Sequence, residues 1–438
     1  SGPRIPRGPR VIALTSAHRT PPRTREDHVR SRTTAPALLA GLALALTACS
    51  TAPTDAPATD RTADEQGEGH GAVTGAAELS EPRLGLTSID PTGAVTHLDL
   101  LDESVTDLGS IGAPTAMTSD GRYLFAQTDA GVEIVDSGVW TWDHVDHFHY
   151  YRADPRLLGT VEGAGTATVA TTNLSTTGGT GLFFPDSGEA VLLDTEALSK
   201  GEVEELFRLD GEPGPGMVVP VGSSALVTEG QGADATVVGH TAEGERTGLV
   251  EPCPDPAGTI TTRVGAVIGC GNGALLATLT DDELAVERIP YPEGTATPPA
   301  TSFDNREGRP TVAGLAGDQG IWLLDTRERA WTLLPAPAPL VHVTAVDDSD
   351  DHLLALTVDG RVLVMSAGDG AVLADTGPLV ADSLAAGRIP TLVADQQRAY
   401  LAGPVEQRLH EIDFADGARV SRTFDTATEP AFTAGTGR

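Results

Sequence analysis

The segment Gly317-Asp318-Gln319-Gly320-Ile321-Trp322-Leu323-Leu324-Asp325 decides the fold, because it contains in nine residues an element that recurs along the chain. A turn of Asp and Gly is followed by an apolar run that ends in Asp. Turns with Asp-Gly or Asn-Gly between apolar runs are typical of β-hairpins. The element therefore predicts antiparallel β-structure.

The same element recurs from Leu84 onward. Its other copies, of which the last three are weaker, lie at residues 128–136, 185–194, 270–275, 358–364 and 407–413. Hairpins spaced by roughly 40 to 50 residues match the blades of a β-propeller. The 50 glycines and 31 prolines of the chain disfavour a long helical alternative. We predict an all-β chain with a β-propeller over residues 83–438.

The hairpin spacing predicts seven blades, with six and eight as alternatives. We place the blades near residues 113–162, 163–212, 217–258, 259–298, 301–338, 342–382 and 389–426. Strands from residues 84–112 are expected to complete the ring beside the C-terminus. A single helical turn is expected at residues 195–201, Thr-Glu-Ala-Leu-Ser-Lys-Gly.

Residues 140–151, Trp-Thr-Trp-Asp-His-Val-Asp-His-Phe-His-Tyr-Tyr, concentrate side chains that bind metal ions. Three histidines and two aspartates lie within seven consecutive residues, namely His144, His147, His149, Asp143 and Asp146. Zinc accepts imidazole nitrogen and carboxylate oxygen in tetrahedral sites, and residues two apart on an extended strand point the same way. The run therefore predicts a metal site on the first blade.

A structural role for this run is the alternative. In it, the imidazoles bond carboxylates while the aromatic rings pack over the edge of the blade. The same donor set also suits copper, nickel or iron. Three histidines and two aspartates in so short a run favour a metal site over packing alone.

The N-terminal region has the pattern of a lipoprotein signal. Arg30 and Arg32 precede an apolar stretch that ends in Leu46-Thr47-Ala48-Cys49-Ser50. This stretch is too short to span a membrane, and small residues before a single Cys are typical of signal cleavage followed by lipid transfer. We expect an extended N-terminus and signal over residues 1–48 and a lipid anchor at Cys49. The protein would then be extracytoplasmic, on the outer face of the cell membrane.

Residues 49–82 contain mostly Thr, Ala, Pro, Asp, Glu and Gly and very few large apolar side chains. Such a segment cannot bury enough surface to offset its ordering entropy, so we predict a disordered acidic tether. The formal net charge of the chain is −33, and removal of the Arg-rich first 48 residues makes it more negative still. A surface this acidic repels nucleic acid, and we expect a monomer without a nucleic-acid partner.

Two cysteines remain once Cys49 carries lipid. We expect a disulfide between Cys253 and Cys270, because exported proteins are in an oxidising compartment. Closing a loop of this size stabilises the folded protein by roughly 3 kcal/mol. A thiolate metal site is disfavoured, since two cysteines without a nearby histidine do not complete a tetrahedron.

Three parts of the chain together resemble the AztD family of secreted β-propeller zinc metallochaperones: residues 144–152, the Cys253-Pro254 and Gly269-Cys270 pair, and residues 431–438. The resemblance covers about residues 84–438. It implies zinc bound in the region of the three histidines, with Asp143 or Asp146 as additional ligands. It also implies delivery of zinc to the solute-binding protein of a zinc ABC importer.

The chain departs from that family where further histidines are expected. Residues 166–169, 214–217 and 255–258 contain none, and the predicted tether over residues 49–82 has only His70. The resemblance therefore predicts a divergent member, and a propeller interaction module that has lost metal transfer is the alternative. No Gly-x-Ser-x-Gly, Walker or His-Glu-x-x-His motif occurs, so an enzyme is not expected. A metal-dependent hydrolase on the same histidines lacks an identifiable carboxylate base.

Overall fold

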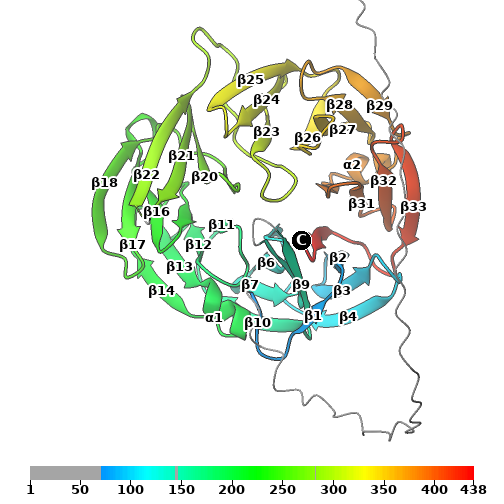
Figure 1. Ribbon diagram of the computed structural model, residues 1–438, viewed down its shortest axis with the longest axis horizontal. Helices are drawn as coiled ribbons and strands as arrows, with labels where there is room; N and C mark the ends of the chain where they lie inside the picture. Colours follow the sequence, from blue (N-terminus) through cyan, green and yellow to red (C-terminus); the bar gives the residue numbers. More distant parts are fainter. Residues whose placement is uncertain (1–70, 144–146, 282) are drawn as a thin grey trace, which may run out of the picture. The chain divides into compact units, whose positions relative to one another are not determined.

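The computed structural model describes residues 71–143, 147–281 and 283–438, and nearly every regular element in them is a β-strand. In this part of the chain, eight antiparallel sheets of three or four strands follow one another around a ring (Figure 1). Successive sheets use successive strands, which is the arrangement of a β-propeller. The predicted fold class is confirmed.

The first four blades comprise the strands from β5 to β22, with one insertion described below. They are β5 (Ala116–Ser119), β6 (Tyr123–Thr128), β7 (Gly131–Asp136) and β10 (Arg156–Val161); β11 (Thr168–Thr171), β12 (Gly179–Phe184), β13 (Glu189–Asp194) and β14 (Glu205–Leu209); β15 (Val218–Val221), β16 (Ser224–Glu229), β17 (Thr236–Thr241) and β18 (Arg246–Pro252); β19 (Thr259–Thr261), β20 (Ala266–Cys270), β21 (Gly273–Thr280) and β22 (Glu283–Pro290).

The next three blades follow in the same way. They are β23 (Thr311–Leu315), β24 (Gly320–Asp325) and β25 (Ala330–Pro335); β26 (Leu340–Ala345), β27 (His352–Thr357), β28 (Val362–Ser366) and β29 (Val372–Asp375); β30 (Thr391–Ala394), β31 (Ala399–Gly403), β32 (Arg408–Asp413) and β33 (Arg419–Asp425). The short helices are α1 (Thr195–Lys200), α2 (Ala381–Ala385) and the 3-10 turn η1 (Gly232–Asp234). The predicted helical turn is thus α1, where the Asp194 carboxylate accepts the Glu196 N–H at 2.8 Å.

The eighth blade joins the two ends of the described chain. It contains β34 (Phe432–Thr436), β2 (Gly85–Ile89), β3 (Ala94–Asp99) and β4 (Val105–Ser110), in that order. The predicted count of seven is therefore one too low for the described residues. The strands expected to complete the ring form a full blade. The sequence repeats do not reveal this blade, because its inner strand β34 comes from the C-terminus.

The segment 317–325 forms a tight turn and strand β24. The Ala316 N–H donates to the Gly320 carbonyl at 2.9 Å, which closes the turn. Alternate side chains of the strand then enter two separate cores: Ile321 and Leu323 pack toward the sixth blade, and Trp322 packs with residues of the fourth. An apolar run without polar alternation is thus explained by burial of both faces between neighbouring blades.

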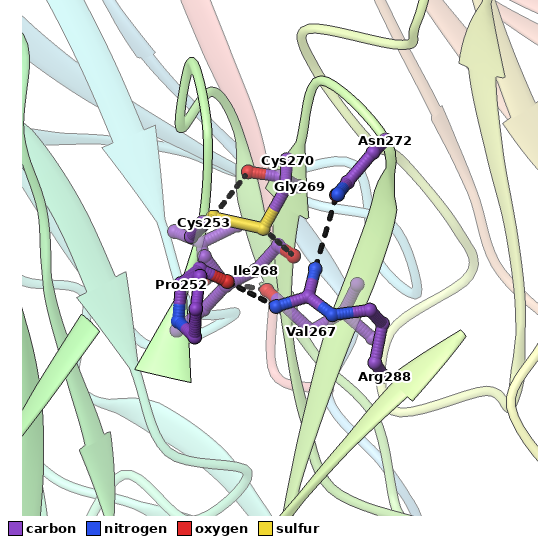
Figure 2. The surroundings of a disulfide bond; sticks show 9 residues. Pro252, Cys253, Val267, Ile268, Gly269, Cys270, Asn272 and Arg288 are labelled. Atoms are coloured by element: carbon purple, nitrogen blue, oxygen red, sulfur yellow. Dashed lines mark hydrogen bonds between the residues drawn. A yellow bond between two sulfur atoms is a disulfide. The ribbon is translucent and has the colours of Figure 1, made fainter. Parts of the chain in front are cut away.

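A disulfide joins the third and fourth blades. Figure 2 shows Cys253, just after β18, bonded to Cys270 at the end of β20. The Arg288 side chain lies beside it and donates to the Asn272 side chain at 3.0 Å and to the Pro252 carbonyl. Both cysteines are buried, so the predicted pair staples two blades from within the core.

A ninth sheet combines a hairpin inserted between β7 and β10 of the first blade with a strand from before the propeller; it is called the inserted sheet below. It has the order β1 (Ala77–Leu79), β9 (Phe148–Arg152) and β8 (Val139–Asp143). Strand β8 is bonded to the C-terminal segment, since the Thr141 N–H donates to the carbonyl of Arg438, and Arg438 is one of the residues that line the central cavity. This inserted sheet carries the described part of the histidine run.

The predicted signal, Cys49 and most of the predicted tether lie outside the described residues. The end of the tether segment is described, and it contains strand β1, so ordered structure begins before residue 83. Among the described residues, no helix combines the length and the apolar character needed to cross a membrane.

Candidate functional site

The histidine run forms a hairpin of β8 and β9 whose connecting residues 144–146 lie outside the described residues. Trp140 lies opposite Tyr151 in the hairpin, and Trp142 lies opposite His149. Because side chains alternate along strands, these four rings share one face of the sheet. The sequence spacing thus places His149 on an aromatic face.

His147 and His149 are brought together as their spacing predicts. Their Nε2 atoms are 2.9 Å apart, and their ring centroids are 4.7 Å apart with an angle of 64° between the planes. At that distance the N–H of one imidazole donates a hydrogen bond to the nitrogen of the other, so the two nitrogens converge on one point. A metal ion that replaces this shared proton would find two imidazole ligands there.

Glu78 orients this pair and was not predicted from the sequence. Its Oε1 atom lies 2.7 Å from Nδ1 of His149. A carboxylate at Nδ1 holds the proton on that nitrogen and leaves the Nε2 lone pair directed outward. Glu78 lies on β1, directly opposite Tyr151. It escaped prediction because it belongs to a segment whose composition predicts a tether, and its partner is 71 residues away.

Asp143 lies at the end of β8, opposite Phe148. Strand alternation places it on the face opposite Trp142 and His149. Its carboxylate is 3.8 Å from the Arg263 guanidinium of the fourth blade. Asp143 therefore has an ionic partner in the fourth blade.

The remaining predicted ligands, His144 and Asp146, lie outside the described residues. Within residues 71–143, 147–281 and 283–438, no three His, Cys, Asp or Glu side chains gather closely enough to hold a metal ion. The described part of the site thus supplies two convergent imidazoles and one orienting carboxylate. A tetrahedral site would need further ligands, and the predicted ligands His144 and Asp146 directly precede His147 in the sequence.

The segment before β1 covers the aromatic face. The Trp140 indole N–H donates to the Gly71 carbonyl at 3.1 Å, and Ala76 is buried against Trp140 and Tyr151. Gly71 has a φ of +76°, and a Cβ there would lie 2.5 Å from the Trp142 ring. Only glycine fits this close approach, which excludes water from one side of the aromatic face.

The central cavity has a volume of about 390 Å³, and its lining includes Asp120, Asp304 and Glu307. Burial raises the pKa of the Asp120 carboxyl to about 6. Burial, and then the nearby Asp120 charge, also raise the pKa of the Glu307 carboxyl. Across the cavity, Asp304 Oδ2 lies 2.7 Å from Nε2 of His342. This cavity holds one histidine, so the paired imidazoles on the inserted sheet remain the stronger candidate for metal binding.

No family model and no curated protein matches this chain. Solved structures do match it. Two structures of AztD from Citrobacter koseri, one of them the apo protein, are 20% identical and cover 81% of this chain. The matches cover 97% and 98% of the two AztD chains, with TM-scores of 0.65 and 0.67. The dihydro-heme d1 dehydrogenase NirN is 14% identical, with a TM-score of 0.51, and the match covers 82% of this chain and 76% of that one. These likenesses establish an AztD-type propeller fold.

Proposed function

We propose that this chain binds zinc on the inserted sheet of its propeller and delivers it to the solute-binding protein of a zinc ABC importer. His147 and His149 would hold the ion, together with His144 and Asp146 or Asp143 as the sequence predicts. The observation that carries the proposal is the convergence of two Nε2 atoms, one of them backed by Glu78. The AztD-type fold and the sequence resemblance support zinc as the cargo.

The chemistry of the pair suits binding followed by release. Neutral imidazole is a zinc ligand, and loading would require the His147 proton to move from Nε2 to Nδ1 of the same ring, which frees Nε2 for the ion. His147 is exposed and the His149 side chain is 19% exposed, so a partner can reach the ion. A site on an accessible hairpin favours transfer over a permanent structural role.

We further propose that the mature protein is exported and anchored by lipid at Cys49. The support is the basic, apolar and small-residue pattern before that cysteine. In a Cys49→Ala variant, the protein should leave the membrane fraction and lose incorporation of labelled fatty acid. Unchanged membrane association would contradict the anchor without bearing on zinc.

A zinc titration against a chromophoric chelator tests the metal proposal. The mature protein should bind one zinc ion with sub-micromolar affinity, and a His147→Ala/His149→Ala variant should lose at least tenfold in affinity. His342→Ala is the matched control, because it removes a histidine that is also paired with a carboxylate at 2.7 Å. Equal binding by the double variant and the control would overturn the assignment.

A propeller that acts as an interaction module is the second candidate. It is favoured by the lack of a three-ligand group in the part of the chain that the structure describes. On this account the purified mature protein contains no stoichiometric metal and does not compete with the chelator. The same titration therefore separates the two functions.

A further inference from the structure

A continuous stack of side chains lies beneath His149. The Arg122 guanidinium carbon is 3.8 Å from the centre of the Trp140 ring. Trp140 stacks on Tyr151 with centroids 5.4 Å apart and an interplanar angle of 23°. Tyr151 in turn is nearly parallel to His149, with centroids 6.3 Å apart and an angle of 17°. The stack connects the interior of the first blade to the histidine pair.

The base of the stack is fixed by ionic bonds. Arg122 and Asp136 are both fully buried, and two guanidinium nitrogens of Arg122 donate to the two carboxylate oxygens at 2.9 Å. Arg156 donates to the same carboxylate at 3.1 Å. Both arginines also donate to the Ser199 carbonyl in the last turn of α1. A bidentate buried pair has little freedom, so Arg122 is a rigid support for the Trp140 ring.

Two contacts together define the orientation of the His149 ring. The nearly parallel Tyr151 ring restricts rotation out of the plane, and the Glu78 carboxylate holds Nδ1 at 2.7 Å. With one edge bonded to Glu78, the other edge points Nε2 toward His147. Metal affinity depends on such preorganisation, because rotamer freedom that remains in the free protein must be lost on binding.

We propose that Arg122, Trp140 and Tyr151 are positioning residues that hold the His149 ring ready for the metal ion. This inference rests on the proposed zinc site and adds to it the element that sets its affinity. The stack predicts that the ring faces of Trp140 and Tyr151 matter for metal binding. It also predicts that the neighbouring Tyr150, on the opposite face of β9, does not matter.

Four variants of the mature protein test this role. Tyr151→Leu removes the ring next to His149, and Tyr151→Phe keeps the ring without its hydroxyl. Tyr150→Leu makes the same change one residue away on the other face. Trp140→Phe shortens the stack and is the milder change. For each variant we would measure zinc affinity by chelator competition, the visible spectrum of the cobalt-loaded protein, and unfolding in the presence of a chelator.

Tyr151→Leu should weaken zinc binding by about tenfold or more and shift the cobalt bands, because His149 loses its fixed orientation. Tyr151→Phe should rescue both, and Tyr150→Leu should change neither. A purely structural role would lower the unfolding midpoint of the apo protein and leave the affinity and the cobalt spectrum of the folded protein unchanged. That pattern would overturn the inference.

The outcomes also separate this inference from the zinc proposal. Absence of zinc binding by the unsubstituted protein overturns the proposed function. Binding that Tyr151→Leu leaves unchanged overturns only the positioning role. If Tyr151→Leu does not fold, Trp140→Phe decides: a loss of about threefold with altered cobalt bands supports the inference, and unchanged binding contradicts it.

Discussion

Glu78 reaches the paired histidines from a different part of the chain. A carboxylate at Nδ1 of a metal-binding histidine typically contributes tenfold to a hundredfold in affinity. We expect Glu78→Gln to weaken zinc binding by about tenfold, because the neutral amide polarises the imidazole less. Glu81→Gln, an exposed change in the same segment, is the control. Equal affinities of the two variants, measured by chelator competition, would rule out this role.

Asp120 lines the central cavity, and its raised pKa makes the stability of the folded protein depend on pH. Its folded pKa of about 6 lies above the value of about 3.9 for an unfolded aspartate. The folded state therefore binds more protons between these values, and ionisation of Asp120 lowers the free energy of unfolding as the pH rises through about 6. The stabilising contribution of the protonated group is complete below about pH 4.

Replacement of Asp120 by Asn should remove this dependence. The amide oxygen can still accept the backbone N–H groups of Arg122 at 3.0 Å and Tyr123 at 2.7 Å. We expect Asp120→Asn to raise the free energy of unfolding by on the order of 1 kcal/mol at pH 8 and to change it little at pH 4. Urea unfolding at the two pH values measures this, with the exposed Asp154→Asn as control. The same effect at both pH values would refute the linkage.

At the scale of elements, the sequence predicted the local hairpins but not the strand pairings between distant segments. The turn and strand of residues 317–325 follow from local residue types, and so does α1 with its Asp194 cap. Strand β1 does not, because three residues are too short for a recognisable strand pattern, and they form a strand only by pairing with the edge of β9. The candidate site was predictable to the same extent. The spacing of His147 and His149 predicted that they converge, whereas Glu78 reaches them only through the non-local pairing of β1 with β9.

The disulfide acts between elements, since it joins the end of β18 to β20. The two cysteines are 17 residues apart in sequence. A Cys253→Ser/Cys270→Ser variant should lose roughly 3 kcal/mol of unfolding free energy, because the unfolded chain regains the freedom of the open loop. Reduction of the unsubstituted protein should have the same effect in denaturant unfolding, and it should not change the double variant. An unchanged denaturation midpoint in both experiments would contradict the stapling role.

At the scale of the molecule, the ring is closed by non-covalent contacts between strands β34 and β2. Thr433 and Ser88 share a hydrogen bond of 3.0 Å between hydroxyls, and Thr436 and Thr87 share one of 3.1 Å, all in buried positions. The repeat length predicted a ring, but the number of blades depends on how the two ends meet. A blade assembled from segments more than 300 residues apart leaves no contiguous repeat in the sequence.

The C-terminal residues that close the ring also contact the strand β8 of the candidate site. The Gly437 N–H donates to the Gly121 carbonyl at 2.8 Å, and the Gly437 carbonyl accepts the Thr141 hydroxyl of β8 at 2.9 Å. Deletion of residues 431–438 should therefore abolish cooperative unfolding and zinc binding together, since the loss of an inner strand opens two edges of the ring.

Strand complementation tests that expectation directly. A synthetic peptide of residues 430–438 added to the truncated protein should restore cooperative unfolding and zinc affinity with the same concentration dependence, because β34 pairs with β2 entirely through non-covalent bonds. A scrambled peptide is the control. Calorimetry and chelator competition on the same samples measure the two effects. Zinc binding that survives truncation at full affinity would show that the inserted sheet keeps its geometry without ring closure, and would uncouple the site from the propeller.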